Sequence, residues 1–153
     1  MNRARELCGA EDTAWVEFLG LVESITPEQM ERPGYLPEGW SVKDLLGHIG
    51  SWQAEAAMML TRIRYGTYVR LTDTVDERNA RFFEANRDLP LDVVRAECWA
   101  GRNRMLEEWA KTFDAATPDD ARLAEGWFVE SGASHYEEHV PRLREWTSEL
   151  RRA

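Results

Sequence analysis

Three histidines are the residues of this sequence whose type and spacing most directly indicate chemistry: His48, His135 and His139. His135 and His139 are four residues apart, so on a helix their imidazoles lie on one face and can bind one ion together. A lone histidine in a helical protein is more often a buried residue that donates to a backbone carbonyl. Two histidines at this spacing, with a third at the edge of another apolar helix face, instead predict a divalent metal site.

Three imidazole ligands would leave at least one coordination position open, which is typical of catalytic sites rather than closed structural ones. A bound water has its pKa lowered toward about 7, and a bound thiol is held as the thiolate. Either nucleophile would attack a small electrophile at neutral pH. All-nitrogen ligation suits zinc, nickel, iron or copper. We expect zinc or nickel, with iron as the alternative.

Two further residues are candidates for the wall of a substrate pocket beside this ion. Glu55 follows His48 by seven residues on nearly the same helix face, and Trp52 lies between them. A solvated position for Glu55 and a core position for Trp52 are the alternatives, and no catalytic acid or base is assigned. If a low-molecular-weight thiol is a cosubstrate, Arg78 and Arg81 are candidate donors to its polar groups.

The elements that must position these residues are helices. Apolar residues recur at intervals of three and four along most of the chain, and no segment alternates as a half-buried strand does. This pattern predicts helices over residues 3–25, 42–64, 75–87 and 90–113, and a last helix that begins near Gly126.

Local signals mark several boundaries of these helices. Ser41 followed by Asp44 resembles a capping box at the start of the second helix. Residues 68–71 and 115–123 are predicted to be connections, the latter because of its Thr-Pro-Asp-Asp composition. Pro141 lacks a backbone N–H and is predicted to kink the last helix.

Four long amphipathic helices and one shorter one indicate an all-α fold, an up-down four-helix bundle with one additional short helix. The chain has 153 residues. That length is sufficient to bury one hydrophobic core, so we expect a single domain over residues 1–153.

Charge and composition argue against several classes of protein. The formal net charge is -9 and the pI is near 4.9, so a phosphate backbone would be repelled and nucleic acid is not an expected partner. No apolar run approaches the roughly 18 residues of a membrane span, and residues 1–10 lack a signal-peptide core, so we expect a cytoplasmic protein. Cys8 and Cys98 match neither a disulfide framework nor a C-x-x-C motif, and we expect both to be reduced.

Two segments resemble motifs of the DinB/YfiT-like superfamily: Gly39–Trp52 (GWSVKDLLGHIGSW) and His135–Pro141 (HYEEHVP). The resemblance covers nearly the whole chain. In that superfamily a four-helix bundle carries a three-histidine metal site, with one ligand on the second helix and two, four residues apart, on the last. His48, His135 and His139 match those positions, so the resemblance implies that they bind a metal ion.

The resemblance is less specific about the reaction. Similar members include low-molecular-weight-thiol transferases, mycothiol-dependent maleylpyruvate isomerases and a colibactin self-resistance cyclopropane hydrolase. The isomerases carry an additional C-terminal domain, which we do not expect here. The segments Trp40–Asp44 (WSVKD) and His135–His139 (HYEEH) look closer to the single-domain branch that contains the hydrolase. A homodimer is compatible with the fold.

Three functional hypotheses follow from the sequence. We expect a metal-dependent enzyme that activates water or a thiol against a small electrophilic metabolite or toxin, as a hydrolase or an S-transferase. The alternative is a non-catalytic protein that binds or sequesters a small molecule or a metal. The third is a dimeric structural bundle with a vestigial site.

Overall fold

The structure is a computed structural model that describes residues 2–113 and 117–153. Within these residues it contains helices and no strand, so the predicted all-α class is confirmed. The helices are α1 (Arg3–Val22), α2 (Pro27–Met30), α3 (Val42–Tyr65), α4 (Val75–Asn86), α5 (Leu91–Phe113), α6 (Pro118–Ser131) and α7 (Ala133–Arg152). None of these helices has both the length and the apolar character that crossing a membrane requires.

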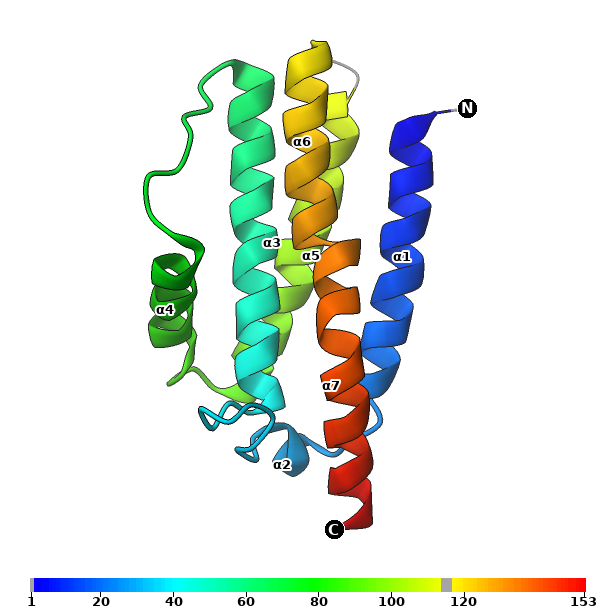
Figure 1. Cartoon of the computed structure of the whole chain (residues 1–153), viewed down its shortest axis with the longest axis vertical. Helices are drawn as coiled ribbons and strands as arrows, with labels where there is room; N and C mark the ends of the chain where they lie inside the picture. Colours follow the sequence, from blue (N-terminus) through cyan, green and yellow to red (C-terminus); the bar gives the residue numbers. More distant parts are fainter. Residues whose placement is uncertain (1, 114–116) are drawn as a thin grey trace.

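Four long rods form the bundle: α1, α3, α5 and the consecutive pair α6 and α7 (Figure 1). The rods α1 and α6–α7 run in one direction, and α3 and α5 run in the other. Because α3 and α5 are parallel, the chain must travel back along the bundle between them. Residues 66–90, which include α4, make this return on the outside of α3. The predicted all-α bundle of four long helices with a short additional helix is therefore confirmed. Its order is not a simple up-down one, because α3 and α5 are parallel and α4 covers the outer side of α3.

Side-chain caps begin several of these helices. Ser41 accepts from the backbone N–H of Asp44, whose carboxylate accepts from the backbone N–H of Ser41, so the predicted capping box is present. Thr74 and Glu77 form the same reciprocal pair at the start of α4. Such caps satisfy N–H groups that have no partner within the helix and stabilise it by about 1 kcal/mol each. They fix where the helices that frame the site begin.

The helix α3 is buried on more than one face because it packs against α4, α5 and α6. Its closest approach is to α5. A Cβ atom added to Gly50 would lie 2.8 Å from the Cα of Cys98, and one added to Gly101 would lie 2.9 Å from the carbonyl oxygen of Gly50. Only glycine permits this separation of the two backbones. The two glycines therefore fix α3, and with it His48, against the rest of the bundle.

The structure corrects two boundaries at the N-terminal end of the chain. The first helix ends at Val22, not near residue 25, and a separate short helix, α2, follows it. A capping box formed by Thr26 and Gln29 starts α2. The apolar spacing continues from α1 to Ile25, which is buried, although the backbone has already turned. Periodicity alone therefore placed the boundary too late.

The C-terminal half required a larger correction. The predicted connection at 115–123 is wrong from Pro118 onward, because α6 begins there with Pro118 in its first turn and Thr117 as its cap. Residues 114–116 lie outside the described part of the chain. The predicted helix from Gly126 is instead two helices. The break between them lies at Gly132, whereas α7 runs unbroken through Pro141.

Gly132 has a backbone conformation that is neither helical nor extended, with φ -108 and ψ -112. A Cβ atom at this position would lie 2.8 Å from the carbonyl oxygen of Phe128, so a larger residue would clash with the backbone. The break displaces α7 from the line of α6 (Figure 1). It therefore sets the position of the helix that carries two of the three histidines.

Candidate metal centre

The structure brings the three histidines together between α3, which carries His48, and α7, which carries His135 and His139. One ring nitrogen from each residue lies within 4.8 Å of the other two. Nε2 of His48 and Nε2 of His135 are 2.8 Å apart. The two histidines on α7 are in its first two turns, directly after the break at Gly132. The three residues therefore form a cluster that could hold a metal ion.

Burial keeps these imidazoles in their neutral form. Burial, together with the smaller effect of the neighbouring histidines, lowers the pKa of His48 to about 4 and that of His135 to about 2. Burial also lowers the pKa of His139, although the charge of Glu138 opposes this effect. A neutral imidazole has one nitrogen lone pair free to bind a metal, whereas an imidazolium has none. The cluster thus presents the donor form at neutral pH.

The surroundings of the rings indicate which nitrogen is available. The hydroxyl of Tyr35 lies 3.0 Å from Nδ1 of His139, which leaves Nε2 of this ring for an ion. Nδ1 of His48 and Nδ1 of His135 are buried and have no hydrogen-bond partner among the described residues. In most metal sites this second nitrogen donates to a carbonyl or carboxylate. Nevertheless, three neutral imidazoles that converge without an intervening carboxylate are a donor set that fits a divalent ion.

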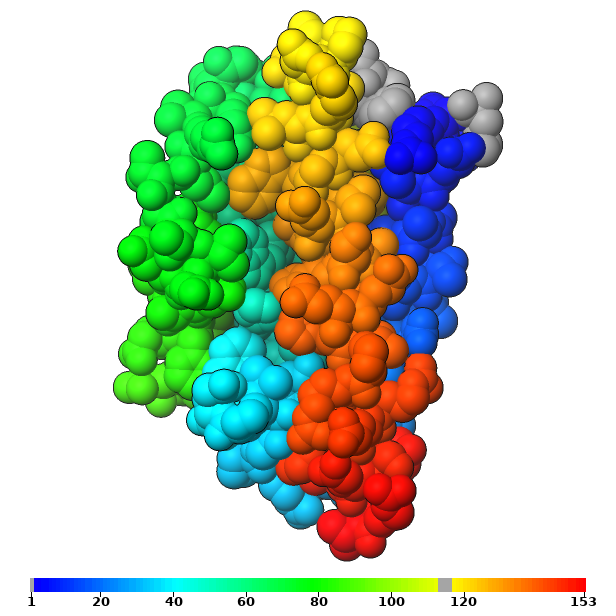
Figure 2. All heavy atoms as spheres, in the orientation of Figure 1, coloured from blue at the N-terminus to red at the C-terminus, as the bar shows by residue number. Residues whose placement is uncertain are grey.

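The histidines line a cleft of about 870 Å³. Figure 2 shows this face of the molecule hollowed between the segment that contains α4 and the helices α6 and α7. Three tryptophans, Trp40, Trp52 and Trp127, form part of the wall. A volume of this order is typical of small-molecule sites, which range from roughly 300 to 1,000 Å³. The cluster is therefore accessible to a small molecule.

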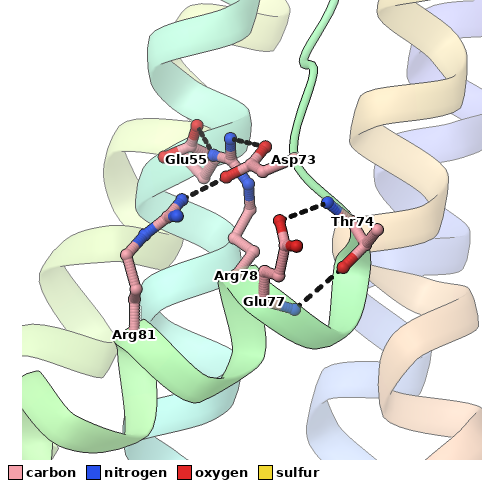
Figure 3. Close-up of polar contacts among 6 residues, drawn as sticks. All are labelled: Glu55, Asp73, Thr74, Glu77, Arg78 and Arg81. Atoms are coloured by element: carbon pink, nitrogen blue, oxygen red, sulfur yellow. Dashed lines mark hydrogen bonds and ion pairs between the residues drawn. The ribbon is translucent and has the colours of Figure 1, made fainter.

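The two residues predicted for the pocket wall have different positions. Trp52 lines the cleft, and its indole N–H donates to Oδ1 of Asn79 at 2.7 Å. Glu55 is not among the lining residues. It forms an ion pair with Arg78, which does line the cleft (Figure 3). Glu55 therefore contacts the wall through Arg78.

The arginines considered as donors to a cosubstrate are bound to carboxylates of the protein. Arg78 donates to Asp73 at 2.7 Å as well as to Glu55. Arg81 pairs with the other oxygen of Asp73 and is largely exposed (Figure 3). These hydrogen bonds lower the pKa of Asp73 to about 2. The four side chains form a compensated cluster that ties the segment before α4 to α3.

A second buried polar group was not predicted from the sequence. Glu11 of α1 is 1% exposed and accepts from Arg102 of α5 through both of its oxygens, at 2.7 and 2.8 Å. The hydroxyl of Tyr136 donates to the same carboxylate at 2.9 Å and accepts from Gln53 at 2.6 Å. Cys98 contacts the amide oxygen of Gln53 at 3.8 Å. We call these five residues the Glu11 network.

Sequence patterns gave no direct signal for the Glu11 network or for Tyr35. Glu11 lies in an acidic pair on a predicted amphipathic helix, where solvent exposure is the usual position of a carboxylate. Tyr35 follows Pro33 and Gly34 in a segment without periodicity. Tyr136 is adjacent to a candidate ligand, which was the one available hint.

The fold and the cleft define an all-α bundle protein with a three-histidine cluster facing a small-molecule site. Residues 12–144 match the family described as the mycothiol maleylpyruvate isomerase N-terminal domain. The chain belongs to this family, which is part of the DinB/YfiT-like superfamily. The resemblance inferred from the two histidine-containing segments is therefore confirmed.

A solved structure supports the same fold. It is described as an uncharacterised protein from Escherichia coli UTI89, and it superimposes with a TM-score of 0.79 at 18% sequence identity. The match covers 99% of this chain and 96% of the other. At this identity the likeness shows the fold alone. A search of proteins with curated functions gave no match.

Proposed function

We propose that this protein is a metal-dependent enzyme that activates water or a low-molecular-weight thiol for attack on a small electrophilic metabolite or toxin. The observation that carries this proposal is the convergence of three neutral imidazoles at a cleft large enough for a small molecule. His48, His135 and His139 would hold the ion, for which zinc or nickel is our choice and iron the alternative. The reaction would be that of a hydrolase or of a thiol S-transferase.

A divalent ion bound by three imidazoles supplies a nucleophile at neutral pH, because it lowers the pKa of a bound water or thiol. The protein's own contribution begins with His139. A metal ion on Nε2 of His139 requires the ring proton on Nδ1, and that N–H would then donate a hydrogen bond to the oxygen of Tyr35. Burial raises the pKa of Tyr35 to about 12, so the phenol stays neutral. Tyr35 therefore orients the ring of His139.

The walls of the cleft contribute shape and exclude water. Trp40 packs edge-on against His48, with ring centroids 5.4 Å apart, and stacks on Phe83 of α4. The hydrogen bond from Trp52 to Asn79 holds a second aromatic surface against α4. These contacts hold the aromatic side chains of the wall in place before a ligand binds, which reduces the conformational entropy lost on binding.

The second candidate function is non-catalytic binding or sequestration of a small molecule or a metal. One observation favours it: no carboxylate of the described residues lies within the histidine cluster as a ready general base. Two carboxylates share nearly the same face of α3 with His48: Asp44 is used in the capping box with Ser41, and Glu55 is paired with Arg78. Turnover separates the two candidates, because both require the same ion and the same cleft.

A cytoplasmic location and a homodimer remain part of the proposal. Cys8 and Cys98 are free thiols, which supports a reducing compartment. Val16 of α1 and Val93 of α5 are exposed apolar residues that a second copy of the chain would cover. Light scattering of the purified protein measures the oligomeric state directly.

The first experiment is metal analysis by mass spectrometry on untagged protein, because a histidine tag would bind metal itself. We expect about one ion per chain in the wild type and almost none in His48→Ala, His135→Ala or His139→Ala, with circular dichroism unchanged. Glu17→Ala, on the exposed face of α1, is the matched control and should keep the ion.

The loaded protein is then screened with thiols and small electrophiles. Turnover that disappears in the three histidine variants supports the enzyme, and saturable binding without turnover supports the second candidate. No metal in the purified protein, and none taken up from added zinc or nickel, would contradict both.

A further inference from the structure

Four carboxylates at the edge of the cleft form no ion pair within the described residues. Glu38, Asp76, Glu130 and Glu138 line it, and none forms a side-chain ion pair or hydrogen bond within the described residues. They lie before α3, on α4, on α6 and on α7, so they approach the cleft from different sides. All four are exposed. They therefore form a negative rim at the solvent-facing side of the cleft.

The inner end of the same cleft points to a ligand independently of this charge. His48 and His135 are about nine-tenths buried there. Their Nε2 atoms lie 2.8 Å apart, and with His139 they form a cluster that could hold an ion. A molecule that reaches these rings must first pass the negative rim.

The cations of the cleft do not neutralise the rim. Arg70 lines it and forms no ion pair within the described residues. Arg78 also lines it, but its guanidinium is bound to Glu55 and to Asp73. Asp73 is in turn paired with Arg81. This compensated cluster adds no net charge, so four unpaired carboxylates face one unpaired guanidinium.

The aromatic walls of the cleft, like the negative rim, favour a cationic ligand over an anionic one. Trp40, Trp52 and Trp127 line the cleft, and the negative face of an indole ring attracts ammonium groups. Two of the three indole N–H groups that could bind an anion are already used. Trp52 donates to Asn79 at 2.7 Å, and Trp127 donates to the hydroxyl of Tyr68 at 3.4 Å.

We propose that this cleft selects small molecules that are neutral or carry an ammonium group, and that it rejects molecules that carry a carboxylate. This inference rests on the proposed function, because it assigns the charge class of the ligand of the same site. Like-signed charges around a cleft with low-dielectric walls produce a potential that attracts counter-ions and repels co-ions. A divalent ion at the histidines offsets this potential at the inner end, but the rim that an incoming ligand meets first stays negative.

Three thiols of similar size test the selection: cysteamine, which is cationic, 2-mercaptoethanol, which is neutral, and 3-mercaptopropionate, which is anionic. Their dissociation constants are measured by calorimetry on zinc-loaded wild type and on the double variant Glu130→Gln, Glu138→Gln. We expect the preference for cysteamine over 3-mercaptopropionate to be roughly tenfold greater in the wild type. Comparing the two proteins cancels the intrinsic differences between the thiols.

The matched control is the double variant Glu31→Gln, Glu107→Gln. It changes the net charge equally at two exposed carboxylates that do not line the cleft. It should keep the wild-type preference, and raising the salt concentration should reduce that preference by screening. Equal affinities for the three thiols, a preference for the anionic thiol, no binding by any of them, or an equal effect of both double variants would each overturn the inference.

A second measurement does not need the metal. Quenching of tryptophan fluorescence by caesium and by iodide reports the access of a cation and an anion to the partly exposed tryptophans, which include Trp40, Trp52 and Trp127 of the cleft. We expect the ratio of caesium to iodide quenching to fall in the Glu130→Gln, Glu138→Gln variant and to change less in the control variant. Metal analysis of the same samples decides the proposed function separately. A protein without metal can thus still confirm the charge selection, and a loaded protein without selection refutes this inference alone.

Discussion

Two groups of polar side chains lie inside the same bundle and share neighbouring residues of α7, yet they differ in how fully they are paired. His135 faces His48 and the cleft, whereas Tyr136, about 100° further around the helix, faces Glu11 and Gln53. In the Glu11 network no buried side-chain oxygen or nitrogen lacks a partner. In the histidine cluster two buried ring nitrogens do lack one.

This difference separates a structural role from a functional one. A buried polar network that is fully paired holds helices in one arrangement, and it has no unpaired atom to offer a ligand. The Glu11 network connects α1, α3, α5 and α7 in this way. In the histidine cluster, by contrast, the Nε2 atoms of His48 and His135 meet at 2.8 Å beside a cleft, where they could bind an ion. The predictions below test this difference by perturbing one group and comparing the result with the other group or with a control.

The largest expected effect is the loss of the metal on replacing His135 by alanine. One of three ligands disappears, so the metal content should fall from about one ion per chain to almost none, measured by mass spectrometry. The adjacent change Tyr136→Phe removes only a hydroxyl of the Glu11 network, and it should lower stability while keeping the ion. If Tyr136→Phe also lost the metal, the two groups would not be separable.

The next effect concerns the pairing of Glu11 with Arg102. Glu11→Gln leaves the partly buried guanidinium of Arg102 without its main partner, which should lower the free energy of unfolding by about 3 kcal/mol in urea denaturation. The metal content should not change. Glu17→Gln breaks an exposed pair with Arg144 and should cost less than about 1 kcal/mol. Equal losses in the two variants would contradict a structural role for the Glu11 network.

Removal of the ion should lower stability by a similar but smaller amount. A ligand present at 100 times its dissociation constant and bound only to the folded state stabilises it by about 2.7 kcal/mol. Chelation should therefore lower the melting temperature of the loaded wild type, measured by calorimetry. The same treatment of His135→Ala should have no effect. If the melting temperature of the wild type changed with neither chelator nor added metal, this result would argue against the metal site.

A smaller effect is expected from Tyr35→Phe. The change removes the oxygen that faces Nδ1 of His139, and the loss of such a partner typically weakens metal affinity by about 10- to 100-fold. Competition with a chromophoric chelator measures this affinity. Tyr68→Phe, elsewhere on the wall of the cleft, is the control and should change it little. An unchanged affinity in Tyr35→Phe would show that Tyr35 does not orient the ligand.

The smallest effect is the reactivity of Cys98, at the end of the Glu11 network. Burial raises the pKa of this thiol to about 12, so the reactive thiolate is scarce below that pH. Iodoacetamide at pH 8 should label Cys98 far more slowly than the half-buried Cys8, and raising the pH to 9 should change this little. Both thiols should react in urea. Equal labelling rates in the folded protein, measured by mass spectrometry, would show that the network opens readily.

The sequence determined the helical class and the identity of the clustered histidines. The four-residue interval between His135 and His139 is a property of one helix, and the capping box at Ser41 fixes the phase of the helix that carries His48. Both depend on residues close together in the chain. For the same reason, local signals placed the starts of α3 and α4 well.

Only the tertiary structure decided how these elements meet. The parallel direction of α3 and α5 follows from the return of the chain along the outside of α3, and the close approach of these two helices joins Gly50 to Cys98 and Gly101, which are distant in sequence. The pairing of Glu55 with Arg78 and of Glu11 with Arg102 joins residues distant in sequence, so the spacing of residues along the chain predicted neither pair. The sequence identifies each charged residue but does not predict its partner, because ion-pair partners are set by packing between helices rather than by spacing along one helix.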